Sequence, residues 1–183
     1  MSNETGSLAP TLLVAMPQLQ DPNFARTVVL LCEHGAQGAM GLVVNRRSGT
    51  FASQIVQLDP PLERESSLEV WIGGPVEPER GWLLVADGSL DGTEICAGLY
   101  LSASLERLRQ AMESPAPSRC RFLVGYAGWA PRQLDTELAA SAWLTVPVDL
   151  DLVFDTPSDD MWEASIRRLG IDPNSLAPGP GVH

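Results

Sequence analysis

The most regular feature of the chain is a series of short apolar runs, rich in valine, leucine and isoleucine, separated by glycine and proline. Such runs, bounded by turn residues, are typical of buried β-strands. Gly35 and Gly38 lie between the second and third runs and predict a hairpin turn. The pattern predicts strands at 11–15, 26–32, 40–45, 69–72, 81–86, 99–101, 121–126 and 150–154, with 99–101 at a sheet edge.

Other segments place apolar residues three or four positions apart, which is the spacing of a helix that buries one face. Ser102 or Ser104 is expected to cap the second of these helices, and Asp159 or Asp160 the last. Gly170 is expected to end the last helix in a left-handed conformation. The predicted apolar stripes are Phe51–Ile55–Leu58 within 50–58, Leu105–Leu108–Met112, Leu134–Leu138 and Trp162–Ile166–Leu169.

The order of these elements predicts the fold class. Strands come first in a run and then alternate with helices, which indicates α+β or an irregular α/β arrangement instead of a regular βαβ series. We find no internal repeat and no linker long enough to divide the chain, so residues 1–183 are predicted to form one domain. Residues 1–9 and 173–183 are predicted to be mobile tails.

Composition and charge limit the kinds of molecule that this protein is expected to bind. The chain has a formal net charge of −11, and all twelve of its basic residues are arginine. Nucleic acids and anionic membranes bind through clustered positive charge, so we expect neither as a direct partner. The lack of lysine excludes a Schiff base and the lysine of a phosphate-binding P-loop.

Cysteine, histidine and hydropathy point to a cytoplasmic protein without a metal. Three cysteines at spacings that fit no metal or redox motif suggest a reducing compartment. The N-terminus has no secretory signal pattern, and no apolar run is long enough to cross a bilayer. With only two histidines, of which His183 lies in the predicted tail, we expect no metal site and no cofactor.

Three stretches of the sequence resemble the AlgH/YqgE family of bacterial proteins. They are DPNFARTVVLLCEHGAQGAMGLVVNR, within the segment from Met16 to Arg46, GGPVEPERG from Gly73 to Gly81, and GYAGWAPRQLDTELAASAW from Gly125 to Trp143. The resemblance implies an α+β fold in which coiled or bifurcated β-sheets pack with several helices. Members of the family are mostly uncharacterised and often labelled transcriptional regulators, so the resemblance implies no established activity.

The first candidate site residues, Cys32, Glu33 and His34, lie at the end of the second predicted strand. Cys32 and His34 are two positions apart on a strand and therefore share a side, with Glu33 on the other. This spacing allows a nucleophile and general-base pair. The alternative is that Cys32 packs in the core and His34 closes the turn. Asn45, at the end of the third strand, is a further candidate ligand-binding residue.

Two more polar segments flank predicted strands. Gly73 and Gly74 could expose backbone amides to an anion, with Arg80 as a planar partner for carboxylate or phosphate. The alternative is an ordinary tight turn. Tyr126 and Trp129 could wall a pocket beside Gln133, or the tryptophan could be a core residue.

We hypothesise that at least two of these three segments share one concave surface, because loops at strand ends often build sites. Three functions remain open. The first is a non-enzymatic protein, regulatory in role, that acts by binding an unknown protein or small molecule. The second is an enzyme or a nucleotide- or anion-binding protein with a polar pocket. The third is a direct DNA-binding regulator, which the negative charge disfavours.

Overall fold

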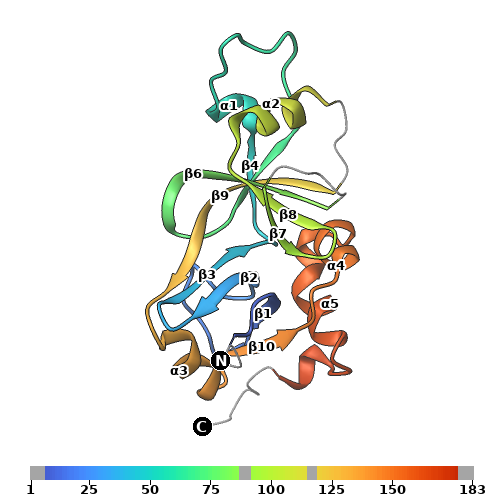
Figure 1. The fold of residues 1–183 in the computed structure, drawn as a ribbon. Coiled ribbons are helices and arrows are strands. Elements are labelled where there is room, and N and C mark those ends of the chain that lie inside the picture. Colours follow the sequence, from blue (N-terminus) through green and yellow to red (C-terminus); the bar gives the residue numbers. More distant parts are fainter. Residues whose placement is uncertain (1–6, 87–91, 115–118, 177–183) are drawn as a thin grey trace. The chain divides into compact units, whose positions relative to one another are not determined.

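The computed structural model describes residues 7–86, 92–114 and 119–176, and their secondary structure confirms the α+β class (Figure 1). The chain divides into two compact units. Unit 1 comprises residues 1–45 and 127–183, and unit 2 comprises residues 46–126. The sequence contains no linker at either junction, and unit 2 is inserted into the chain of unit 1.

The sheet of unit 1 is antiparallel, in the order β10-β1-β2-β3-β9. Strands β2 and β3 form the predicted hairpin, which closes where Gly35 faces Gly38. Strand β9 contributes only its last residues, from Ala127 onward, to this unit. The bounds are β1 Thr11–Ala15, β2 Val28–Gly35, β3 Gly38–Val43, β9 Cys120–Trp129 and β10 Trp143–Val146.

Helices cover both faces of this sheet. Leu13 and Val29 on one face pack with Leu134 of α3 (Gln133–Ala139). The alternate residues are also fully buried, and α5 (Met161–Arg167) contacts β1, β2 and β10. Burial on both faces explains why the strands of unit 1 are continuous apolar runs.

Helix α5 is fixed to the sheet by its tryptophan. Trp162 is buried and donates a hydrogen bond of 2.8 Å from Nε1 to the backbone oxygen of Ala15. The predicted stripe is correct for Trp162 and Ile166 but wrong for Leu169, which is 37% exposed. Asp160 occupies the N-cap without a side-chain cap bond, because a 3-10 turn, η2 (Ser158–Asp160), leads into the helix. Gly170 has the predicted positive φ.

The sheet of unit 2 has the order β4-β5-β9-β6-β8-β7, with β5 and β9 parallel and the other pairs antiparallel. Strand β8 pairs with β6 on one side and β7 on the other, so the prediction that it is an edge strand was wrong. The bounds are β4 Arg47–Phe51, β5 Glu69–Ile72, β6 Val76–Val85, β7 Thr93–Cys96 and β8 Leu99–Ser102.

Two helices of unit 2, α1 (Ala52–Ile55) and α2 (Leu105–Glu113), pack on one face of this sheet. Ser104 caps α2 by accepting a hydrogen bond from the backbone of Arg107, as predicted. Leu108 and Met112 enter the core with Phe122 of β9. Leu105, the third member of the predicted stripe, is instead 63% exposed.

The helix predicted at 50–58 was largely wrong. Residues up to Phe51 belong to β4, and the helix that follows makes a single turn. Two members of its expected apolar stripe, Phe51 and Ile55, are 46% and 51% exposed. The pairing of β4 with β5 competes with helix formation for the first residues of this segment.

The strand predicted at 150–154 was also wrong, because Leu150–Asp155 is helix α4. Asp149 caps this helix by accepting hydrogen bonds from the backbones of Asp151 and Leu152. An aspartate before a short apolar run favours a helix start over a strand. Strands β7 and β10, each four residues long, were not predicted.

The described residues of the predicted tails contact the rest of unit 1. The backbone of Leu8 is hydrogen-bonded, Ala9 packs against the core, and Pro173 is buried at the start of η3 (Pro173–Ser175). The rest of the predicted tails, residues 1–6 and 177–183, lies outside the described residues. In the part of the chain that the structure describes, no helix is long and apolar enough to cross a membrane.

Candidate functional site

His34, at the end of β2, uses both of its ring nitrogens in unit 1. Its Nδ1 accepts a hydrogen bond of 3.0 Å from the backbone of Leu8. Its Nε2 therefore carries the proton and donates to Asp135 of α3 at 2.9 Å. The side chain is 7% exposed. This histidine joins the N-terminal segment to α3, and neither nitrogen is free to take a proton from a substrate.

Cys32 lacks the features of a nucleophile. Burial first, and then the charge of Glu33, raises the pKa of its thiol to about 12. The thiol donates a hydrogen bond of 3.5 Å from its sulfur to the backbone oxygen of Leu30. A thiol with this pKa stays protonated at neutral pH, and the thiolate is the reactive form. Glu33 is exposed, and the pairing of β2 with β3 is irregular between Leu31 and Glu33, so simple alternation does not assign the sides of these residues.

Asn45 has a structural role at the end of its strand. Its Oδ1 accepts a hydrogen bond from the backbone of Val28, and its Nδ2 donates to the backbone oxygen of Arg26, both at 3.0 Å. Arg26 has a positive φ of 58°. The amide stabilises this strained turn and joins two neighbouring strand ends.

Gly73 and Gly74 form a turn in unit 2. The amide of Gly73 donates to the backbone oxygen of Val124 at 2.7 Å, so it is not available to an anion. A Cβ at Gly125, where φ is +76°, would lie 2.2 Å from the oxygen of Gly74. Positive φ explains Gly74 (155°) and Gly125 as requirements of the fold.

Arg80 and Tyr126 meet on the surface of unit 2. The guanidinium lies 4.4 Å from the ring centre of Trp82 and 3.8 Å from the carboxylate of Glu77. The hydroxyl of Tyr126 donates to the same carboxylate at 3.0 Å, and this hydrogen bond raises the pKa of Tyr126. Arg80 braces Trp82 and is already engaged with an acidic side chain.

Trp129 and Gln133 belong to a hydrogen-bonded cluster in unit 1. Glu137 Oε1 accepts from the indole nitrogens of Trp129 and Trp143 at 3.0 and 2.9 Å. Its Oε2 accepts from Gln133 at 3.0 Å. The two indoles pack edge to face, with ring centres 6.0 Å apart. This cluster closes the space between α3 and the sheet.

The structure thus brings the candidate residues together in two places. In unit 1, His34 contacts the helix that carries Gln133, and in unit 2, Tyr126 and Arg80 share Glu77. A single concave surface shared by at least two of the three segments stays a prediction. Among the described residues, no group of three or more histidine, cysteine, aspartate or glutamate side chains is placed to hold a metal ion.

Sequence reasoning missed an apolar hollow in unit 2, which we call the α2 groove. It has a volume of about 540 Å³ and lies beside the N-terminal half of α2. Leu105 and Ile55 border it and are largely exposed. The residues that define the groove are Ile55, Val56, Trp82, Leu105, Leu108 and Phe122.

The serine hydroxyls in the groove are satisfied locally, whereas the buried Nε1 of Trp82 has no hydrogen-bond partner among the described residues. Ser102 accepts from the backbone of Ser104, and the hydroxyl of Ser104 caps α2. Trp82 is held edge to face against Tyr126, with ring centres 6.2 Å apart. The groove therefore offers mainly apolar surface with an aromatic wall, and the indole N–H of Trp82 is its one buried side-chain polar atom without a partner among the described residues.

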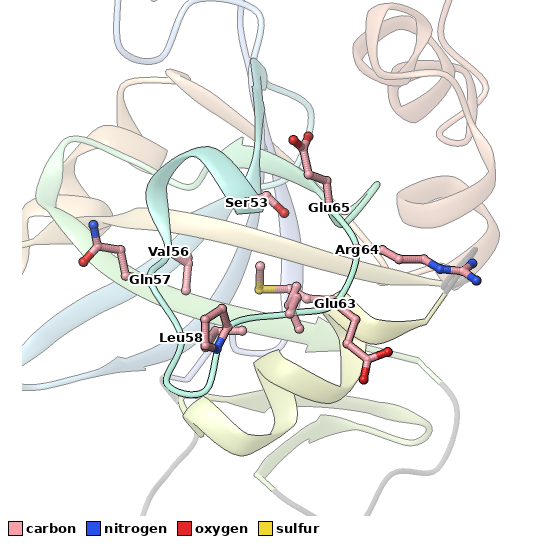
Figure 2. A pocket seen from close by; sticks show the side chains of 10 residues that line it. Ser53, Val56, Gln57, Leu58, Glu63, Arg64 and Glu65 are labelled. Carbon is pink, nitrogen blue, oxygen red and sulfur yellow. The ribbon is translucent and has the colours of Figure 1, made fainter.

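A second hollow, the loop pocket, adjoins the groove at Val56 and has a volume of about 500 Å³. It lies under the segment between α1 and β5 and is shown in Figure 2. Val56 and Leu58 turn toward the pocket, whereas Glu63 and Arg64 point outward from its rim. The pocket thus repeats the apolar interior of the groove under a charged rim.

Comparison with known proteins identifies the family. The sequence profile described as AlgH-like matches residues 12–174. The chain belongs to the AlgH-like family. Among its relatives, a UPF0301 protein of Myxococcus xanthus is 41% identical and a UPF0301 protein of Anaeromyxobacter sp. (strain K) is 43% identical. The alignments cover 97% and 95% of this chain and 99% and 94% of those proteins.

Solved structures agree with this AlgH-like assignment. The solution structure of the AlgH protein from Pseudomonas aeruginosa is 36% identical, with a TM-score of 0.77 over 99% of this chain and 98% of that one. A crystal structure from Corynebacterium diphtheriae, 23% identical with a TM-score of 0.68, covers 92% of this chain and 90% of that one and shows a similar fold. The names of these proteins state no activity.

Proposed function

We propose that this AlgH-like protein is a non-enzymatic binding protein, regulatory in role, that holds an apolar segment of another protein in the α2 groove. The observation that carries the proposal is the exposure of Leu105 and Ile55 at the border of a preformed apolar hollow. Exposed apolar surface gathered around a hollow is typical of protein interaction sites.

The composition of the groove favours a protein segment over a small polar ligand. Its serine hydroxyls are used in local hydrogen bonds, so they do not fix the orientation of a small molecule. A braced tryptophan beside leucine and isoleucine resembles the aromatic and aliphatic anchors of protein interfaces. A helical segment with apolar residues on one face fits such a surface.

The test uses a peptide of about 14 residues, or four helical turns, with leucine along one face and glutamine elsewhere. Fluorescence anisotropy should show saturable binding to the full chain. Leu105→Glu should weaken this binding at least tenfold, because it places a carboxylate beside apolar surface. Leu169→Glu, which changes an exposed leucine of unit 1 in the same way, should bind like the unmodified protein.

Two results oppose the proposal. Absence of binding to the unmodified chain is one. Equal binding by the Leu105→Glu and Leu169→Glu proteins is the other, because it places the contact outside the groove. Circular dichroism of both variants checks that they are folded, and the exposure of both leucines makes folding the expected result.

A further inference from the structure

We infer that the partner of the α2 groove is a cationic amphipathic protein segment, in which arginine or lysine side chains flank the apolar residues that enter the groove. This inference rests on the proposed function and adds the charge of the partner to it. It is carried by the acidic side chains beside the groove and by the way two neighbouring arginines are already paired.

Acidic side chains beside the groove lack partners within the described part of the chain. Glu79 lines the groove, is exposed, and makes no hydrogen bond or ion pair with another described residue. Glu106 follows Leu105 in the first turn of α2 and is equally exposed and unpaired there. Glu63 and Glu65, at the rim of the adjoining loop pocket, are also exposed and unpaired within the described residues.

Two arginines near these carboxylates, Arg80 and Arg109, are engaged with other acidic side chains. Arg80, which follows Glu79, pairs with Glu77 and stacks on Trp82. Arg109 pairs with Glu113 and donates to the backbone oxygen of Pro60. Arg107 and Arg64 are exceptions, because neither forms an ion pair with a described residue: Arg107 donates to the neutral side chain of Gln110, and Figure 2 shows the side chain of Arg64 directed away from the loop pocket. The border of the groove therefore has an excess of negative charge that a basic partner neutralises.

The net charge decides between two occupants of an apolar groove. A second copy of this chain would bring another net charge of −11 to the contact, and like charges repel at an interface. A basic segment is attracted by the same charge and associates faster at low ionic strength. Charge complementarity thus favours a cationic partner over self-association.

The experiment compares three peptides that share one leucine face and carry arginine, glutamine or glutamate at the flanking positions. The full chain should bind the arginine peptide about tenfold more tightly than the glutamine peptide, and the glutamate peptide most weakly. Raising the salt from about 0.05 M to about 0.5 M should remove most of this difference, since salt screens exposed charges.

A double variant, Glu79→Gln with Glu106→Gln, locates the effect. This variant should bind the arginine peptide about threefold to tenfold more weakly than the unmodified protein does, and should bind the glutamine peptide with unchanged affinity. The matched control, Glu33→Gln with Asp159→Asn, removes the same charge from exposed residues of unit 1. The control should have a smaller effect than the groove variant.

The outcomes separate the two proposals. If the three peptides bind equally and Leu105→Glu abolishes binding, the groove stands and the cationic partner is rejected. Equal weakening by the two double variants also rejects it, because attraction is then a property of the whole chain. Failure of the glutamine peptide to bind rejects the groove itself. A dimer in sedimentation equilibrium that Leu105→Glu dissociates identifies a second copy as the occupant.

Discussion

Helices α3 and α2 both lie on a β-sheet, one in each unit, but only α3 is sealed against its sheet. Leu134 of α3 is buried beside Trp129 and Trp143, and Glu137 binds both indole nitrogens. Helix α2 buries Leu108 and Met112 but leaves Leu105 exposed above an apolar hollow. Similar apolar spacing along two helices therefore leads to a closed core in one unit and an open groove in the other.

The difference follows from the side chains on the facing strands. In unit 1, large indoles fill the space between helix and sheet. In unit 2, the groove is lined at Gly81, where an added Cβ would lie 2.8 Å from Cε1 of Phe122. A larger residue at this position cannot fill the hollow without moving the phenylalanine. The groove is thus part of the packing of unit 2.

The largest expected effect tests how tightly unit 1 is packed. Trp162→Ala should lower the free energy of unfolding by about 3–5 kcal/mol, because it removes a buried indole and its hydrogen bond to Ala15. Urea denaturation followed by circular dichroism measures the change. A loss below about 1 kcal/mol would show that α5 is peripheral to the fold.

The closure of α3 depends on one carboxylate. Glu137→Leu should cost about 2–4 kcal/mol, because two indole N–H groups and the Gln133 amide lose their acceptor. Glu137→Gln keeps an acceptor oxygen and should cost less. If the two variants unfold at the same urea concentration, the hydrogen bonds do not seal this helix.

Helix α2 offers a direct contrast between adjacent turns. Leu108→Ala should cost about 2–3 kcal/mol, because Leu108 is buried in the core of unit 2. Leu105→Ala should change stability by less than about 0.5 kcal/mol, because its side chain is mostly exposed. Similar losses for the two variants in urea denaturation would mean that the groove is closed in solution.

A smaller expected effect than that of Leu108→Ala concerns the thiol of unit 1. The pKa of Cys32 is raised to about 12 from 9.0, so above pH 9 the unfolded chain loses this proton more readily than the folded one. Its stabilising contribution is complete below pH 9 and is lost as the pH rises toward 12.

Between pH 8 and pH 10 the stability should fall by about 1 kcal/mol more in the unmodified protein than in Cys32→Ala. Urea denaturation at each pH measures this difference. Parallel decreases in the two proteins would show that the thiol ionises equally in the folded and unfolded chains.

Much of the fold could be predicted from the sequence because apolar runs mark the buried strands. The β2–β3 hairpin and the cap of α2 at Ser104 followed from local residue types. Leu150–Asp155 could not be assigned in this way, since five or six apolar and acidic residues fit a short helix or a strand. The cap at Asp149 was the signal that could have decided it.

The candidate site was less predictable, for a different physical reason. Polar residues such as Asn45 and Gln133 mark places where hydrogen bonds are needed, and the structure shows those bonds within the fold. The α2 groove exists because no other element packs over Leu105. The spacing of apolar residues along one helix does not tell whether another element covers them. Only the neighbouring strands and α1 determine it.

The course of β9 sets the order in which the two units can be completed during synthesis. Every residue of unit 2 has been made once Tyr126 is added, whereas unit 1 still lacks part of its sheet and its helices. Strands β1, β2 and β3 of unit 1 therefore cannot complete their packing until β10 and α5 have been synthesised. Because a chain begins to fold while it is being made, the unit that is completed first can fold first. Unit 2 is therefore able to fold before unit 1, although its first residue is made later.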